Sequence, residues 1–124
     1  MQNIIKIFKA LGDTNRLRLV NILLLRGELC VCDLQAILDL PQTRVSRHLA
    51  LLNAAGLVKS RRKSALILYR INDAPGDFAK RLLRFLKSTL KMNEKLANDL
   101  QEFDHLAQKG KLTSHKPGGH CNSR

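Results

Sequence analysis

The chain has 124 residues, of which 44% are hydrophobic, and this is enough to fold one small domain. Its formal net charge of +12 indicates an acidic partner, which is either nucleic acid or an anionic membrane surface. No apolar stretch approaches the ~20 residues of a membrane-spanning helix. Lysines also interrupt the start of the chain too early for a signal peptide. We therefore expect a cytoplasmic protein with no membrane partner.

Residues 1–27 predict two helices. Apolar side chains recur at helical spacing across residues 4–11, which is typical of a short amphipathic helix. Residues 12–14 end this helix and cap the next one. Gly27 ends the second helix, because glycine accepts the left-handed backbone conformation that commonly follows a helix.

A helix-turn-helix is predicted to follow. A short third helix begins near Cys32, and a fourth begins with Pro41 in its first turn and ends at Gly56. Val45 and Leu49 would point inward from the fourth helix. Two short helices separated by about three residues, the second polar on one face, are typical of a DNA-reading unit.

The second half of the chain predicts a hairpin and one long helix. Strands over residues 57–59 and 65–71 would flank a basic tip at 60–64, forming a wing. A helix over residues 77–108 would be roughly 45–50 Å long, more than a small domain needs internally. Its surplus apolar face would pack, with the first helix, on a second subunit.

These elements predict a mainly α fold, a winged helix-turn-helix with the order α-α-α-α-β-β-α that forms a homodimer. Residues 1–108 would make the DNA-binding and dimerisation domain. Residues 109–124 contain glycine and proline and would form a flexible C-terminal tail.

A basic surface is predicted around the helix-turn-helix and the wing. No acidic residue lies between Asp39 and Asp73, although several arginines and lysines do, and this favours contact with phosphates. The polar face of the fourth helix could read bases in the major groove, and the wing could reach phosphates or the minor groove. A solvated basic face is the alternative, and His48 could equally pack between helices. The candidate DNA-binding residues are Gln42, Thr43, Arg44, Ser46, Arg47, His48, Arg61, Arg62 and Lys63.

Cys30 and Cys32 stand just before the helix-turn-helix. In a reducing compartment three cysteines are better read as ligands or reactive thiols than as a disulfide framework. Residues i and i+2 lie about 200° apart on a helix, so the two sulfurs converge only if Cys30 lies at the helix cap or before it. The helix N-terminus should favour both thiolates. The alternative is that the cysteines are small apolar residues packing a turn.

Three segments, residues 11–18, 28–34 and 46–52, resemble the ArsR/SmtB family of metal-responsive repressors. The resemblance covers roughly residues 2–105, and the second and third segments together are similar to its arsenite-responsive branch. It implies a homodimer that represses an arsenical-resistance operon by binding an inverted repeat in double-stranded DNA. Arsenite or antimonite would bind the cysteines as the regulatory ligand and release the protein. The resemblance implies no enzyme and no catalytic cofactor.

The chain departs from this branch at one position. The best-known arsenite sensors of the branch carry a third cysteine where this chain has Gln35. As(III) prefers three thiolates, and Cys121 in the tail is the one remaining cysteine of the sequence. The candidate ligand set is Cys30, Cys32 and Cys121, with two thiolates and an exogenous ligand as the alternative.

Two other signals remain open at this point. Cd(II), Pb(II) and Zn(II) also suit thiolate ligands, although the cadmium sensors of the family carry further cysteines near the N-terminus that this chain lacks. Thiol oxidation is the second, and it would require Cys121 to pair with Cys30 or Cys32, since a Cys30–Cys32 bridge would be strained. A DNA-binding protein that responds to no effector is a third hypothesis. An enzyme is not expected, because no phosphate loop or acidic pair is evident.

Overall fold

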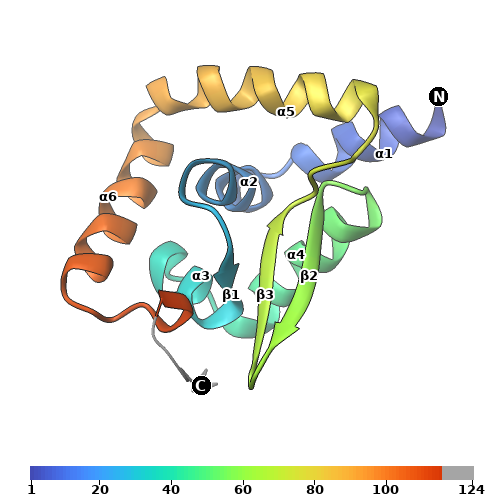
Figure 1. Ribbon diagram of the computed structural model, residues 1–124. Coiled ribbons are helices and arrows are strands. Elements are labelled where there is room, and N and C mark those ends of the chain that lie inside the picture. Colours follow the sequence, from blue (N-terminus) through green and yellow to red (C-terminus); the bar gives the residue numbers. More distant parts are fainter. Residues whose placement is uncertain (116–124) are drawn as a thin grey trace.

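Helices surround a small sheet in the computed structural model, which describes residues 1–115 (Figure 1). In chain order the elements are α1 (Gln2–Leu11), α2 (Thr14–Arg26), β1 (Leu29–Cys30), α3 (Val31–Leu38), α4 (Gln42–Ala54), β2 (Val58–Lys63), β3 (Leu66–Ile71), α5 (Asp77–Thr89) and α6 (Glu94–Gln108), with 3-10 turns at Leu90–Met92 and Thr113–His115. Among residues 1–115, no helix combines the length and the apolar character needed to span a bilayer.

The predicted boundaries of the first helices are confirmed. The Asp13 carboxylate caps α2 by accepting hydrogen bonds from the backbone N–H groups of Asn15 and Arg16, at 3.0 and 3.1 Å. Gly27 follows α2 with a φ of 83°, which side chains other than glycine rarely adopt. α1 ends at Leu11, one residue before the glycine that the sequence analysis placed in the break.

The core lies where α2, α3 and α4 meet. Leu19, Ile22, Leu34, Leu49 and Leu52 are among its fully buried side chains, and they come from all three helices. Each such side chain contributes about 1.5–3 kcal/mol when it leaves water. This shared core fixes α3 and α4 relative to α2, as the helix-turn-helix prediction requires.

The sheet has three antiparallel strands in the order β1-β3-β2. The sequence predicted β2 and β3 but not β1, which at two residues is too short to show an alternating pattern. The predicted five-residue tip at 60–64 is wrong, because β2 continues to Lys63 and the turn lies at Ser64, where φ is 57°. Cys30 pairs with Leu68, and Leu68 also pairs with Arg61, so the cysteine segment is joined to the wing through the sheet.

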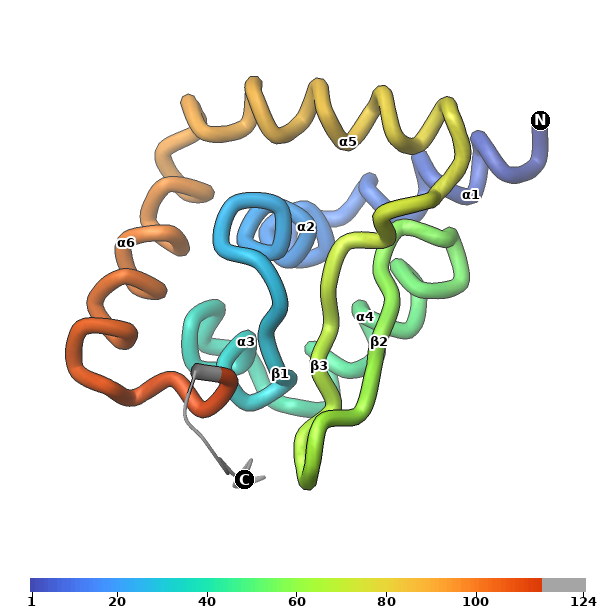
Figure 2. Tube along the Cα trace, in the orientation of Figure 1, coloured from blue at the N-terminus to red at the C-terminus, as the bar shows by residue number. Residues whose placement is uncertain are grey.

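The single long helix predicted over residues 77–108 is also wrong. The chain breaks at Leu90–Met92, and Asn93 caps α6 by accepting a hydrogen bond from the Leu96 N–H at 3.2 Å. Figures 1 and 2 show α6 turning sharply away from α5 and running down beside α2 and α3. Phe103 on α6 is buried there. α6 therefore packs on the chain's own core instead of continuing along the axis of α5.

The segment after α6 returns to the cysteine segment. Leu112 is 2% exposed and belongs to the main core, and the turn at Thr113–His115 lies against β1 and α3 (Figure 2). Residues 112–114 of the predicted tail are thus packed on the domain. The tail beyond residue 115, including Cys121, lies outside the described residues, and the division at residue 108 stays a prediction.

Candidate nucleic-acid interface and cysteine site

The face of α4 opposite the core carries the candidate base-reading residues. Val45 and Leu49 anchor the helix in the core, since both are fully buried. Thr43, Arg44 and Arg47 are exposed, while Gln42 and Ser46, the remaining candidates on this face, are half-buried. The exposed arginines can therefore reach a DNA groove without disturbing the packing of α4.

His48 lies inside rather than on this face. It is 9% exposed, and its Nδ1 is 3.2 Å from Nη1 of Arg16, a residue of α2 that the sequence analysis did not single out. Its Nε2 is 4.0 Å from an Asp13 carboxylate oxygen. Burial lowers the pKa of His48, the Asp13 carboxylate opposes this, and Arg16 and Arg44 lower it further. This geometry favours the helix-packing role of His48 over a phosphate contact.

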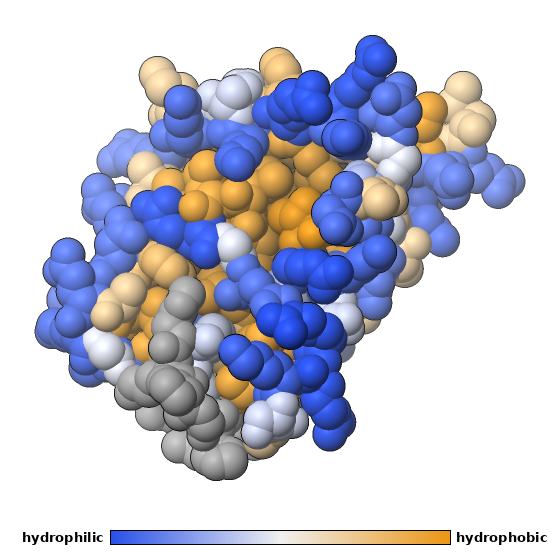
Figure 3. Space-filling model, in the orientation of Figure 1, coloured by the Kyte–Doolittle hydropathy of each residue, from blue (hydrophilic) through white to orange (hydrophobic). Residues whose placement is uncertain are grey.

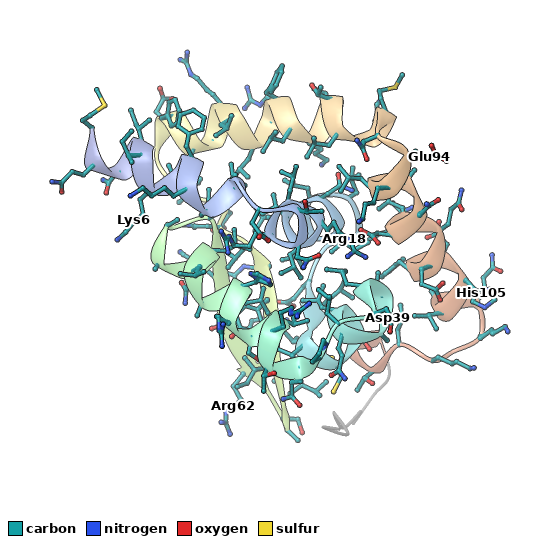
Figure 4. All side chains as sticks on the ribbon, turned by 180° about the vertical axis from the view of Figure 1, so that it is seen from behind. Lys6, Arg18, Asp39, Arg62, Glu94 and His105 are labelled. Atoms are coloured by element: carbon teal, nitrogen blue, oxygen red, sulfur yellow. The ribbon has the colours of Figure 1, made fainter. Side chains whose placement is uncertain are left out.

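The wing presents basic side chains along β2. Lys59, Arg62 and Lys63 are exposed, and Arg62 points away from the body of the protein in Figure 4. Figure 3 shows hydrophilic side chains along the outer edge of the wing, with an apolar area between the sheet and α5. These three side chains can reach an acidic partner without rearrangement.

Arg61 differs from its neighbours on the wing because it already has an acidic partner. Its Nε and Nη2 donate to the two carboxylate oxygens of Glu28, at 2.7 and 2.6 Å. The hydrogen bond from Arg61 lowers the pKa of Glu28, so this pair is ionised at neutral pH. Glu28 directly precedes the cysteine segment, and the pair therefore links that segment to the wing.

Arg18, which forms an ion pair with Asp99, also contacts the turn between α3 and α4. Arg18 donates to both carboxylate oxygens of Asp99 on α6, each at 2.9 Å, and to the backbone oxygen of Leu38 at 3.1 Å. Asp39 follows Leu38 with a φ of 55°. Figure 4 shows Arg18 between α2 and α6, on the inner side of this turn. The orientation of α4 thus depends on α6 as well as on the core.

Cys30 caps α3, and the condition for the two sulfurs to converge is met. Its φ of −83° and ψ of 165° are those of an extended residue just before the helix. Cys30 is 1% exposed and packs with Leu66 and Leu68, and Cys32 packs against the same small cluster. The two cysteines therefore share one apolar environment beneath β3.

The prediction that the helix N-terminus favours the thiolate is wrong for Cys30. Burial raises the pKa of its thiol, while a hydrogen bond with the Ser114 hydroxyl acts in the opposite direction. Desolvation of a buried anion outweighs the helix dipole at this position. A thiophilic ion bound there would have to displace a proton.

Asp33 and Ser114 complete the surroundings of Cys30. The Asp33 carboxylate accepts hydrogen bonds from the backbone N–H groups of Thr113 and Ser114, at 2.7 and 2.6 Å, and from the Ser114 hydroxyl. The Ser114 oxygen accepts the Cys30 N–H at 2.7 Å. Asp33 is 2% exposed, and the returning segment supplies three hydrogen bonds to its carboxylate.

The described residues bring two cysteines into one cluster but form no complete metal site. Among residues 1–115, no group of three or more histidine, cysteine, aspartate or glutamate side chains could hold a metal ion. Cys121, the third predicted ligand, lies outside this range. The chemistry of the cluster nevertheless suits a soft ion, because Cys30 and Cys32 lie together among apolar side chains.

Sequence reasoning missed Glu28, Asp33 and Ser114. Glu28 and Asp33 lie within the segment that carries the cysteines, but nothing local indicates their partners 33 and about 80 residues further along the chain. An aspartate in the first turn of a helix is also common for dipole reasons alone. Only the folded chain reveals these contacts.

Comparison with known proteins places this geometry among regulators. Residues 13–60 match the family model described as bacterial regulatory protein, arsR family. The chain is 47% identical over 68 residues to the arsenical resistance operon repressor of Escherichia coli K12, covering 55% of this chain and 58% of that protein. It is 39% identical over 71 residues to a cadmium resistance transcriptional regulatory protein, a CadC homolog of Staphylococcus aureus, covering 57% and 59%. The chain thus spans little more than half the length of these two relatives.

A third relative is covered more fully. An uncharacterised HTH-type transcriptional regulator of Methanocaldococcus jannaschii is 41% identical over 68 residues, covering 55% of this chain and 76% of that protein. The solved homodimeric winged helix-turn-helix DNA-binding domain of a possible ArsR-family regulator from Mycobacterium bovis gives a TM-score of 0.61 at 26% identity. That match covers 75% of this chain and 86% of the other. The predicted winged helix-turn-helix fold is confirmed.

Proposed function

Because the chain belongs to the arsR family of bacterial regulatory proteins, we propose that it is a DNA-binding transcriptional repressor of an arsenical-resistance operon. Arsenite or antimonite binds to its cysteine thiolates and releases it from the operator. The protein acts in the cytoplasm, as the sequence predicts, and has no catalytic cofactor. The observation that carries the proposal is the position of Cys30 and Cys32, which share one cluster at the start of α3.

The proposed effector site is built from Cys30, Cys32 and Cys121. The first two supply soft donors from one apolar cluster, and the third supplies the remaining thiolate that a trigonal As(III) ion prefers. α3 leads from this site, through the turn at Asp39, directly into α4. An ion that draws the two sulfurs together would distort the first turn of α3 and so re-aim α4.

The proposed partner is an inverted repeat in double-stranded DNA, bound by a homodimer. Half-sites whose centres lie about one helical turn apart would place an α4 in successive major grooves. The base contacts come from Gln42, Thr43, Ser46 and Arg47, and the phosphate contacts from Arg44, Arg62 and Lys63. Arg61, the remaining basic candidate of the wing, is paired with Glu28. To lower the operator affinity ~100-fold, the ion must bind the DNA-free form more favourably by only about 2.7 kcal/mol. This is a modest requirement for an ion held by thiolates.

Substitution of the cysteines tests the proposal. Cys30→Ser and Cys32→Ser keep the size of the side chain and remove the soft donor, so operator affinity should stay within about twofold while release by arsenite is lost. Fluorescence anisotropy on a labelled operator, with and without arsenite, measures both quantities. Normal release of either variant at saturating arsenite would contradict the site assignment.

A cadmium-responsive repressor of the same fold is the second candidate. The Staphylococcus aureus relative named for cadmium resistance favours it, since that protein is 39% identical over the matched region. Titrating cadmium and lead beside arsenite in the same anisotropy assay separates the two candidates by the ion that acts at the lowest concentration. Release by peroxide alone, reversed by a reductant, would instead identify a thiol-redox sensor.

A further inference from the structure

The segment at 111–115 lies directly over the proposed effector site. Its backbone donates two hydrogen bonds to the Asp33 carboxylate, and the Ser114 hydroxyl both donates to Asp33 and accepts from the Cys30 N–H. Hydrogen bonds to an ionised acceptor are roughly twice as strong as neutral ones. Two consecutive residues, Thr113 and Ser114, therefore hold the segment on the first turn of α3 through several hydrogen bonds. We call this set of hydrogen bonds the clasp.

An apolar anchor precedes this clasp. Leu112 is 2% exposed and belongs to the main core, whereas its neighbour Lys111 is exposed. Cys30, which the clasp touches, is 1% exposed. A thiophilic ion in solution consequently has no open path to this sulfur while the segment is in place.

We propose that residues 111–115 form a lid, clasped by Asp33 and Ser114, whose opening admits the effector to Cys30. This inference rests on the proposed function for the identity of the effector, but the shielding of Cys30 is a property of the fold alone. The lid opens as a unit because Asp33 holds Thr113 and Ser114 together. Opening breaks the hydrogen bonds to Asp33 and Cys30 and uncovers the thiol.

The shielding can be measured without any effector. In a Cys32→Ser, Cys121→Ser background Cys30 is the single thiol of the full chain, and its reaction with iodoacetamide is followed by mass spectrometry. Asp33→Asn and Ser114→Ala should each accelerate alkylation by roughly tenfold or more, because each weakens bonds that hold the lid closed.

The two variants are complementary because they act on thiol acidity in opposite directions. The Asp33 charge raises the pKa of Cys30, whereas the Ser114 hydrogen bond lowers it. Acceleration by both variants cannot therefore come from thiol acidity. Asp77→Asn and Ser88→Ala are the matched controls, an aspartate in the first turn of α5 and a serine hydroxyl bonded to the Phe85 carbonyl. Neither control should change the rate.

The effector is tested next in the chain with all three native cysteines. Stopped-flow mixing with arsenite should show faster association for Asp33→Asn and Ser114→Ala than for the controls. An unchanged alkylation rate would overturn the lid, and so would a rise that only follows the fall in global stability measured in urea. Accelerated alkylation with unchanged arsenite association would show that opening of the lid does not control the access of arsenite to Cys30. Accelerated alkylation in a protein that binds no arsenite would uphold the lid and refute the proposed function.

Discussion

Asn21 on α2 is fully buried, and neither polar atom of its side chain has a hydrogen-bond partner among the described residues. An unsatisfied buried amide costs roughly 1–3 kcal/mol, and an apolar side chain of similar size avoids that cost. We expect Asn21→Leu to raise the free energy of unfolding by about 1 kcal/mol in urea titrations.

Asn72 is the matched control for this prediction. Its Nδ2 donates to the Gly56 carbonyl at 2.8 Å, and its Oδ1 accepts the Ala74 N–H at 3.1 Å. Asn72→Leu should therefore lower the free energy of unfolding by about 1–3 kcal/mol. A loss of stability in Asn21→Leu as large as that in Asn72→Leu would show that Asn21 has a structural role.

His48 makes stability depend on pH. Burial depresses its pKa below the ordinary value of 6.5, so the unfolded chain takes up a proton more readily than the folded one. Its contribution to stability is fully present above 6.5 and is lost as pH falls through the folded-state pKa. Urea titrations between about pH 8 and pH 5 should show a decline that His48→Gln makes shallower. The exposed His105 on α6 is the control, and His105→Gln should leave the decline unchanged.

At the scale of elements, the wing and the cysteine segment share the pair between Arg61 and Glu28. Glu28 occupies the guanidinium that would otherwise face a phosphate, so Glu28→Gln should raise affinity for DNA of any sequence. The slope of log affinity against log salt should become steeper by about one, the value for one further phosphate contact. Anisotropy at several salt concentrations measures both.

The control for this prediction removes an acidic charge elsewhere. Asp77→Asn on α5 changes the net charge by the same amount, and its carboxylate is paired with Arg81 of its own helix at 3.4 Å. An equal rise in affinity for both variants would mean that overall charge, and not the release of Arg61, is responsible.

At the scale of the whole molecule, α1 and α5 expose large apolar side chains on neighbouring surfaces. Ile5, Phe8, Phe78 and Phe85 are 46%, 53%, 40% and 60% exposed. Phe8 and Phe78 make an edge-to-face contact with ring centroids 5.9 Å apart. Aromatic side chains of this kind are enriched at the cores of subunit interfaces. This surface supports the proposed homodimer, and it includes the first helix that the sequence analysis assigned to it.

A charge placed on this surface should separate the subunits. Phe85→Glu should produce a monomer in analytical ultracentrifugation and lose high-affinity binding to a two-half-site operator, because one subunit reads only one half-site. Ile67→Glu is the control for oligomeric state, since Ile67 is 46% exposed but lies on β3. A dimeric Phe85→Glu protein would place the interface elsewhere.

The sequence by itself determined the elements whose signals are local. Periodic apolar residues gave α1 to α4, Asp13 and Gly27 marked the ends of α2, and the spacing of Cys30 and Cys32 required a cysteine at the helix cap. These features depend on backbone preferences and on neighbours within one or two turns, so they can be read along the chain. The helix-turn-helix followed from them.

Only the tertiary structure decided what each functional side chain meets. The break before α6 depends on packing against α2 and α3, since the apolar pattern of residues 77–108 is equally compatible with one continuous helix. The partners of Arg61, His48 and Asp33 come from distant parts of the chain, and pairing between distant charges leaves no periodic signal. The buried thiol of Cys30 shows the same limit, because burial, which sets its pKa, is decided by the segments that fold over it.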